Sequence, residues 1–173
     1  FFDSLKATYR EFEDWFQKIS QQGRKCLVYL RDDESIGALL IYKIENEAIV
    51  SNPPLPSSKR LKLCTFKVSQ EGSKIGELFI KLSVEIALKN DLPEIYLTCF
   101  AEAEERLVEL IAEYGFQQVA VQHNGEAVFL KKLFPDPADI PNLSPTDVAY
   151  NFYPSFQDGK VVDSVQIGAL PTQ

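Results

Sequence analysis

The stretch KVSQEGSKIGELFIKLSVEIA, residues 67–87, constrains the fold more than any other part of the chain. The segment that leads into it, 61–68, alternates with the two-residue period of a strand. Beyond the loop, apolar residues recur at helical spacing to about Asn90, namely Ile75, Leu78, Phe79, Leu82 and Ile86. A strand that enters a helix through a short glycine-containing loop is typical of sheets that carry helices on their faces.

The strand at 61–68 is expected to present two faces. Its alternation places on one face Leu61, Leu63, Thr65 and Lys67. The other face then carries Lys62, Cys64, Phe66 and Val68. The stretch SNPPLPSSKR (51–60) just before it contains three prolines, which predicts a loop.

The other segments extend the same pattern. Helical spacing predicts helices over 4–22 and 101–115, and apolar runs predict strands over 25–30, 35–44 and 94–100. Near the end, 116–122 and 127–134 flank His123-Asn124-Gly125-Glu126, and Asn-Gly between apolar runs predicts a hairpin. The order is therefore α-β-β-β-α-β-α-β-β. It predicts an α/β (α+β) fold with a mixed, mostly antiparallel sheet flanked by helices.

Charge and composition restrict the function. The net charge of −7 argues against a sequence-independent grip on nucleic acid through this domain. No apolar run is long enough to span a bilayer, so we expect no membrane role. Cys26, Cys64 and Cys99 lie in apolar strand-like runs, and their spacing matches no metal-binding motif. We therefore expect buried thiols, no bound metal and a cytoplasmic location. Methionine is absent, even at position 1, and we expect this chain to be part of a longer protein.

The loop before the helix at 75–90 is a candidate anion site. The first four N–H groups of a helix lack partners there, and the helix dipole places partial positive charge at the same end. Gly72 and Gly76 would let the backbone approach a ligand closely. On this interpretation, Gly76→Asp should abolish binding and leave the fold nearly intact.

In this context the chain resembles the GNAT (Gcn5-related N-acetyltransferase) family. The family's phosphate loop, Arg/Gln-x-x-Gly-x-Gly/Ala, aligns with residues 71–76, EGSKIG. The stretch ELIAEYGF (109–116) is similar to the end of the family's later helix, and the final hairpin also fits. The resemblance covers about residues 2–134. It implies one domain over 1–134 whose usual first strand and first helix precede Phe1. Residues 135–173 then form a Pro-rich extension or the start of a further module, in which 160–167 is a possible strand.

The resemblance implies an N-acyltransferase, with N-acetyl transfer as the expected reaction. Acetyl-CoA or another acyl-CoA, the co-substrate, would bind between strands 61–68 and 94–100, where the backbone of Phe66 and Val68 would pair with the pantetheine arm. The pyrophosphate would lie on the N–H groups of Gly72, Ser73, Lys74, Ile75 and Gly76. The acceptor would be a small-molecule or protein amine that attacks the thioester directly.

Four positions depart from the family pattern. Glu71 and Lys74 replace the first Arg/Gln and the first Gly of the loop, Ile111 replaces a Tyr that serves as general acid, and Glu104 replaces a common Asn. Tyr114, one turn beyond Ile111, is a weak candidate for the acid, although a tyrosine in an apolar stripe usually packs in the core. These departures keep an alternative open. In it, the chain is a catalytically weak or inactive module that binds CoA or a protein partner, including another domain of the full-length protein.

Other residues receive secondary roles. Glu45 or Glu47 is a possible general base, although both fit the solvated surface better. The acidic helix residues Glu102, Glu104, Glu105, Glu109 and Glu113 fit a solvated face. Trp15, with Phe12 and Phe16, is a candidate for the lining of an acceptor groove, and core packing is the preferred interpretation for both phenylalanines. His123 is too isolated to support a Cys–His pair.

Overall fold

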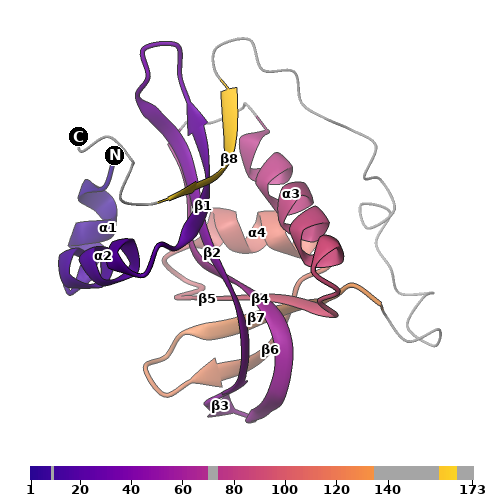
Figure 1. The fold of residues 1–173 in the computed structure, drawn as a ribbon. Coiled ribbons are helices and arrows are strands. Elements are labelled where there is room, and N and C mark those ends of the chain that lie inside the picture. The colour runs from indigo at the N-terminus through magenta and orange to yellow at the C-terminus, as the bar shows by residue number, and fades with distance from the viewer. Residues whose placement is uncertain (9, 70–73, 135–159, 167–173) are drawn as a thin grey trace.

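A twisted, mixed sheet runs through the molecule and organises the other elements (Figure 1). The structure is a computed structural model that describes residues 1–8, 10–69, 74–134 and 160–166. Within these residues, eight strands follow the order β3-β6-β7-β5-β4-β2-β1-β8. Their bounds are β1 Lys25–Leu30, β2 Ile36–Ile49, β3 Ser51–Asn52, β4 Leu55–Val68, β5 Glu94–Cys99, β6 Gln117–Gln122, β7 Ala127–Lys132 and β8 Lys160–Gln166.

Among the described strands of this sheet, only one neighbouring pair is parallel. β4 pairs parallel with β5, because the helix α3 (Ile75–Lys89) carries the chain back along one face between them. The other neighbours are antiparallel, from the β1–β2 hairpin to the β6–β7 hairpin. The predicted mixed, mostly antiparallel sheet with flanking helices is therefore confirmed.

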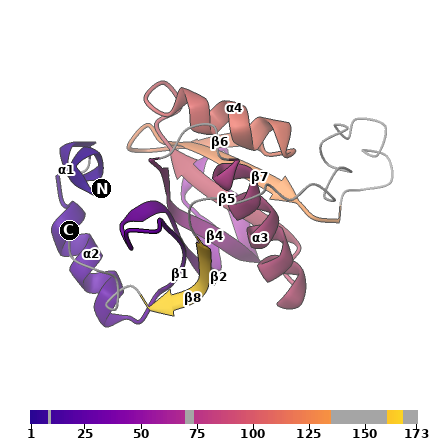
Figure 2. The same ribbon diagram turned by 90° about the horizontal axis from the view of Figure 1, so that it is seen from above.

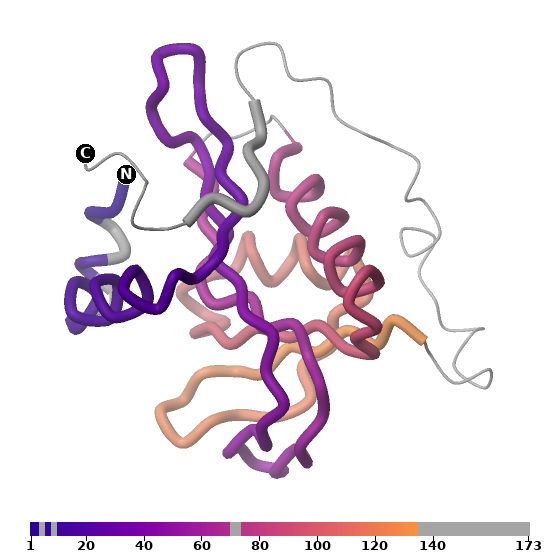
Figure 3. The backbone as a smooth tube through the Cα atoms, viewed as in Figure 1, coloured from indigo at the N-terminus to yellow at the C-terminus, as the bar shows by residue number. Residues whose placement is uncertain are grey.

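Helices cover both faces of the sheet (Figures 2 and 3). On one side lie α3 and α4 (Glu105–Glu113), which pack on a core that includes fully buried Phe79 and Ile111. On the other side lie α1 (Asp3–Thr8) and α2 (Phe12–Gln21), which cover a second core around Phe12 and Ile41. Burying a phenylalanine or leucine contributes about 1.5–3 kcal/mol each, so both layers fix the central strands from opposite sides.

The N-terminal segment is two helices, and the prediction of one helix over 4–22 was wrong. The ring of Phe2 lies 5.7 Å from that of Phe12 and 5.3 Å from that of Phe16. In a continuous helix, Phe2 and Phe12 would be separated by about 15 Å along the axis. Aromatic burial therefore favours a chain that folds back between α1 and α2.

The predicted loop at 51–60 was also wrong. β4 begins at Leu55 and continues through Pro56, and β2 is correspondingly longer than expected. The pairing of β2 with β4 shifts register between Glu47 and Ile49, opposite this proline-containing segment. A proline, which has no N–H to donate, is tolerated in a strand at such an irregularity.

A bulge interrupts β4 at Cys64 and overturns the predicted alternation. Ile41 pairs with Thr65, whereas the next residue, Tyr42, pairs with Leu63, so Cys64 is the extra residue. As a result Leu63 and Phe66 both pack toward the α3–α4 core, and Cys64 packs toward the opposite core. Strict alternation would have put Leu63 and Phe66 on opposite faces.

The C-terminal expectations are partly tested. The β6–β7 hairpin is confirmed, with Gly125 at φ +90° and the Gln122 N–H donating to the Glu126 carbonyl over 2.7 Å. β8 confirms a strand near 160–167, and it pairs antiparallel with β1 at the edge of the sheet. Residues 135–159 lie outside the described part of the chain. None of the described helices is long and apolar enough to cross a membrane.

Candidate functional site

The site begins where β4 and β5 separate. Their pairing runs from Arg60–Glu94 to Leu63–Leu97 and then ends, although both strands continue. The bulge at Cys64 lies one residue beyond the last pair. The two strands therefore form a V with its closed end at Leu63 and Leu97.

The open edge of β4 offers main-chain hydrogen-bonding groups. The Ser69 N–H donates to the Gly37 carbonyl over 2.9 Å, which marks the hydrogen-bonded positions of the β2–β4 ladder. These positions alternate along an antiparallel pair, so the N–H and C=O groups of Phe66 and Val68 point away from β2. No strand pairs with β4 on that side beyond Leu63 in the described residues. The structure thus leaves the backbone of both residues exposed to the V.

A cavity of about 390 Å³ occupies the mouth of the V. This volume lies within the usual range of small-molecule pockets. β4, β5 and α2 supply much of its lining, and several charged side chains complete it. The lining residues are Glu11, Phe12, Trp15, Arg24, Lys43, Lys62, Leu63, Cys64, Thr65, Phe66, Leu97, Thr98, Cys99, Glu104, Leu107 and Glu126. The expected groove position of Trp15 is consistent with this lining, and Phe12 both packs in the core and lines the cavity.

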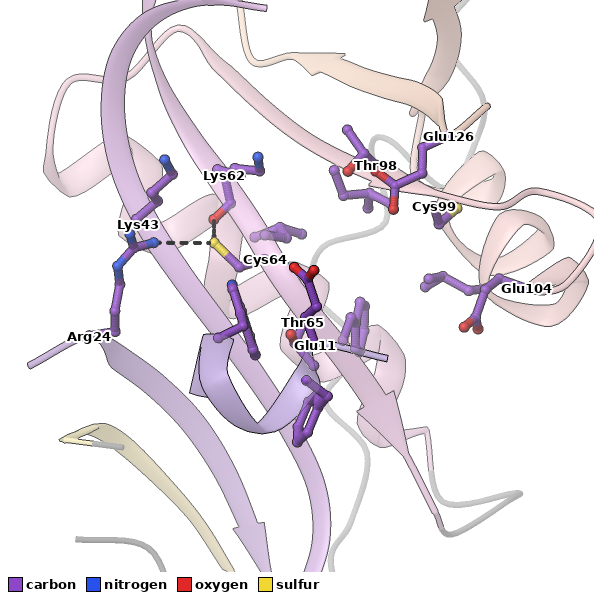
Figure 4. A pocket seen from close by; sticks show the side chains of 16 residues that line it. Glu11, Arg24, Lys43, Lys62, Cys64, Thr65, Thr98, Cys99, Glu104 and Glu126 are labelled. Carbon is purple, nitrogen blue, oxygen red and sulfur yellow. Dashed lines mark hydrogen bonds between the residues drawn. The ribbon is translucent and has the colours of Figure 1, made fainter. Parts of the chain in front are cut away.

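Positive charge gathers at one end of the cavity, around the Cys64 thiol (Figure 4). Lys43 on β2 and Lys62 on β4 pair directly across the ladder, so their side chains share a face. Arg24, just before β1, points its guanidinium at Cys64, with an Nη1–Sγ distance of 3.7 Å. Burial raises the pKa of the Cys64 thiol, and the charges of Lys62, Arg24 and Lys43 oppose that rise.

Negative charge gathers at the other end, where Glu104 and Glu126 lie beyond Thr98 and Cys99 (Figure 4). Glu104 precedes α4 and is half-buried. Burial raises the pKa of its carboxyl above the ordinary value, against the opposing charge of Lys67. The prediction that Glu104 belongs to a solvated helix face was therefore wrong, whereas Glu102, Glu105, Glu109 and Glu113 are exposed as predicted.

Two features separate Glu104 from those neighbours. The turn at 101–104 brings it back toward β5, and its backbone N–H donates to the Phe100 carbonyl over 3.1 Å. Its partial burial keeps a proton acceptor of raised pKa beside the cavity, and a higher pKa makes a carboxylate a stronger base.

The other expected acid–base residues lie elsewhere. Tyr114 is 8% exposed in the α3–α4 core and does not line the cavity, and Ile111 is fully buried beside it. Glu45 accepts a hydrogen bond from the Tyr96 hydroxyl and forms an ion pair with Lys43. Burial acts to raise the pKa of Glu45, and these two hydrogen bonds hold it below its usual value. Glu47 and His123 are exposed and do not line the cavity.

The expected phosphate loop is only partly described. Gly72 and Ser73 lie outside the described residues, as does Glu71. Lys74 precedes α3 with φ +55° and is exposed, and Ile75 is 1% exposed. A Cβ at Gly76 would lie 2.7 Å from Leu110 Cδ2 of α4. Helix packing therefore accounts for this glycine without a ligand.

The basic end of the cavity was not predicted from the sequence. Arg24, Lys43 and Lys62 are far apart in the chain, and none lies in a motif. Only the register of β2 against β4 and the entry into β1 bring them together. A signal was nevertheless present, because lysines in the middle of two otherwise apolar strands require a hydrated or charged surface.

Comparison with known proteins identifies the architecture. An acetyltransferase of the GNAT family from Staphylococcus aureus Mu50 superposes on 72% of this chain and 77% of its own, with TM-score 0.53 and 11% identity. PH1933 from Pyrococcus horikoshii OT3 matches 73% of this chain and 74% of its own, with TM-score 0.52 and 17% identity. This chain has the GNAT fold.

A further solved structure matches a smaller share of this chain. A GNAT-family acetyltransferase from Listeria monocytogenes 4b F2365 is 21% identical over 62% of this chain, with TM-score 0.47. This chain spans 64% of that protein's length. No protein-family model and no curated protein matches the sequence. The expected resemblance is thus confirmed as a GNAT fold.

Proposed function

We propose that this chain is an acyl-CoA-dependent N-acyltransferase that transfers an acyl group, acetyl in the simplest case, to an amine. The observation that carries the proposal is the V between β4 and β5, which combines an unpaired strand edge with a cavity of about 390 Å³. An extended pantetheine arm carries amide groups, and these can pair with a free strand edge as another strand would. The backbone groups of Phe66 and Val68 are available for this pairing.

The reactive thioester would then lie at the closed end of the V. Because Cys64 is the extra residue of a bulge, its backbone N–H is not part of the regular β2 ladder, and it lies next to the last β4–β5 pair. A main-chain N–H at this point can polarise the thioester carbonyl as negative charge develops on its oxygen. The phosphates would extend toward the start of α3 and, as the sequence predicts, would bind the N–H groups of Gly72, Ser73, Lys74, Ile75 and Gly76.

Glu104, at the other end of the cavity from Cys64 (Figure 4), would act as the general base through water held between its carboxylate and the amine. The amine nitrogen attacks the thioester carbon, the new C–N bond forms, and the C–S bond breaks with release of the CoA thiolate. Glu104 takes a proton from the amine, and the thiolate takes a proton from solvent water to leave as the free thiol. No residue of this chain is assigned as the acid, since Tyr114 lies in the core and does not line the cavity.

Two measurements test this function in order. Calorimetry with acetyl-CoA tests binding, and steady release of free thiol in the presence of an amine panel tests transfer. We expect Glu104→Gln to lower kcat by about 10²–10⁴-fold, the usual contribution of a general base, with little change in acetyl-CoA affinity. The matched control is Glu105→Gln, an exposed carboxylate on the next residue.

The outcomes separate the two candidate functions. Binding without thiol release in any amine mixture would replace the transferase with a CoA-binding regulatory module. An absence of both heat and thermal stabilisation with millimolar acetyl-CoA would contradict both functions. Equal effects of Glu104→Gln and Glu105→Gln would remove Glu104 from the reaction.

A further inference from the structure

Three cations gather at the end of the cavity where the thioester is proposed to lie. Arg24, Lys43 and Lys62 line this end, and the Arg24 guanidinium points at the Cys64 thiol (Figure 4). Lys43 forms an ion pair with Glu45. Arg24 and Lys62 have no carboxylate within ion-pair distance in the described part of the chain. This end of the cavity therefore carries an excess of positive charge.

The sheet holds these cations in an arrangement that is unfavourable without an anion. Lys43 and Lys62 lie directly opposite each other in the β2–β4 ladder, and like charges at such positions destabilise a sheet. Arg24 donates to Cys64 Sγ and, over 3.0 Å, to Gln22 Oε1, and neither acceptor carries a charge. Arg24 and Lys62 are half-buried, and partial removal from water disfavours a charge that has no ionic partner. This end is therefore suited to an anion that arrives with a ligand.

An aromatic ring fixes the position of the Lys62 ammonium. Its nitrogen lies 5.4 Å from the centroid of the Tyr96 ring, and the Tyr96 hydroxyl donates to Glu45. A cation on an aromatic face keeps its charge and can still donate hydrogen bonds to an anion. Lys62 is thus positioned to bind a negatively charged group in the cavity that it lines.

The rest of the cavity is unsuited to an anion. Glu11, Glu104 and Glu126 line it, and their carboxylates repel a further negative charge. Among the residues that line this cavity, only those beside Cys64 therefore favour an anionic group of the ligand.

Distance from the thioester indicates which part of the ligand carries this anion. In the proposed reaction the Cys64 N–H polarises the thioester carbonyl, and Arg24 Nη1 lies 3.7 Å from Sγ of the same cysteine. Three bonds separate this Sγ from its own backbone nitrogen, so the two atoms lie within about 4 Å. An acetyl group ends roughly 1.5 Å beyond its carbonyl carbon and stops short of the cations. An acyl chain with two or three methylenes would place a terminal carboxylate roughly 4–5 Å from that carbon, within reach of Arg24.

We propose that the preferred donor is the CoA thioester of a dicarboxylic acid, such as succinyl-CoA or glutaryl-CoA. The free carboxylate of the acyl group lies against Arg24 and Lys62. This inference rests on the proposed acyl transfer and assigns the donor class of the same site. The amine nitrogen attacks the thioester carbon, the C–N bond forms, the C–S bond breaks, and the amine proton passes through water to Glu104. CoA leaves as the thiol with a proton from solvent water, and the amide product keeps the distal carboxylate unchanged.

Binding of unreactive donors tests the inference without an acceptor. The matched pair is S-(3-carboxypropyl)-CoA and S-butyl-CoA, two thioethers with four-carbon chains that differ in the terminal carboxylate. Calorimetry should give a Kd about tenfold or more lower for the carboxylate, in line with hydrogen bonds to charged groups. The net charge of −7 acts against the more anionic ligand, so a preference for it must come from local cations.

Variants locate the effect. Arg24→Gln and Lys62→Gln should each bring the ratio of the two Kd values toward one, with little change in the affinity for S-butyl-CoA. Lys18→Gln, an exposed lysine on α2 that does not line the cavity, should leave the ratio unchanged. Circular dichroism of each variant confirms folding, and two independent variants keep the test valid if one is unstable.

Transfer assays separate this inference from the proposed function. With an amine panel, and after subtraction of the rate without protein, kcat/KM for thiol release should be about tenfold or more higher with succinyl-CoA than with butyryl-CoA. Equal Kd values for the two thioethers would overturn the inference and leave acyl transfer intact. A carboxylate preference that survives both Arg24→Gln and Lys62→Gln would overturn it as well. A preference that depends on these cations, without thiol release from either thioester, would refute the transferase and support the anion site. Absence of binding by both thioethers would overturn both proposals.

Discussion

Gly76 offers the sharpest test of how the start of α3 is built. A Cβ at this position would lie 2.7 Å from Leu110 Cδ2, whereas ordinary van der Waals contact begins near 3.4 Å. The obstacle is the end of a flexible side chain, so Leu110 can turn away at an off-rotamer cost of about 0.5–1.5 kcal/mol. The gain in helix propensity from Gly to Ala is at most about 1 kcal/mol. Gly76→Ala should therefore change the free energy of unfolding by less than about 1 kcal/mol.

A larger side chain cannot be accommodated in the same way. Gly76→Val should destabilise the fold by about 1–3 kcal/mol, as overpacking usually does. Leu110 is partly buried, and Leu110→Ala should cost roughly 1–2 kcal/mol, less than the 2–5 kcal/mol of a fully buried leucine. Because Leu110→Ala also removes the clash, the double variant should be more stable than the sum predicts by at least about 0.5 kcal/mol.

Urea unfolding followed by fluorescence of Trp15 measures all four proteins of this cycle. Additive effects of Gly76→Val and Leu110→Ala would refute the packing explanation and restore the close approach of a ligand as the reason for glycine. The same contact limits what the variant Gly76→Asp can test, because this substitution was expected to leave the fold nearly intact. An aspartate Cβ meets the same Leu110 atom, so loss of binding in that variant would not by itself locate the phosphates.

Four further predictions concern charge and protonation. Because burial raises the pKa of Glu104, kcat/KM should fall as pH drops through that raised value, with an acid limb above pH 4.5, and Glu104→Gln should remove this limb. Folding disfavours the ionised form of the Glu104 carboxyl. The wild type should therefore lose stability relative to Glu104→Gln as pH rises from the pKa of this group in the unfolded chain through its raised pKa in the folded protein, as thermal melts would show. Arg60→Ala strands Glu94, its partner at 2.6 Å, and should cost about 3–5 kcal/mol in urea; a loss below 1 kcal/mol would contradict a structural ion pair. Burial raises the pKa of Cys26, which is fully buried and does not line the cavity, to about 12, so iodoacetamide at pH 8 should alkylate this thiol only as fast as the chain unfolds.

The sequence predicts the order of elements because each helix or strand carries its own period. It misses features that depend on two segments at once. The break after α1 follows from Phe2 meeting Phe12, and the length of β4 follows from its pairing with β2. The sequence of 61–68 alternates regularly and shows no sign of the bulge at Cys64. The bulge nevertheless turns the Phe66 side chain to the opposite face of the sheet.

The candidate site likewise has one part that the sequence predicts and one part that it does not. The main-chain part, at Phe66 and Val68, follows from strand order and was expected at those residues. The charged part depends on register, which sets Lys43 opposite Lys62, and on a single turn that brings Glu104 inward. Neither is encoded as a local pattern, so Arg24, Lys43 and Lys62 were absent from the expected site.

The V between β4 and β5 has a consequence for the cohesion of the molecule. In the described part of the chain, the four strands β3-β6-β7-β5 and the four strands β4-β2-β1-β8 are joined within the sheet only along Arg60–Leu63 and Glu94–Leu97. An extended ligand laid along the free edge of β4 would lengthen that joint, because it adds hydrogen bonds across the gap. The bound substrate would then pair with β4 as an additional strand. Hydrogen exchange of the backbone amides in β4 and β5 would therefore report whether the site is occupied.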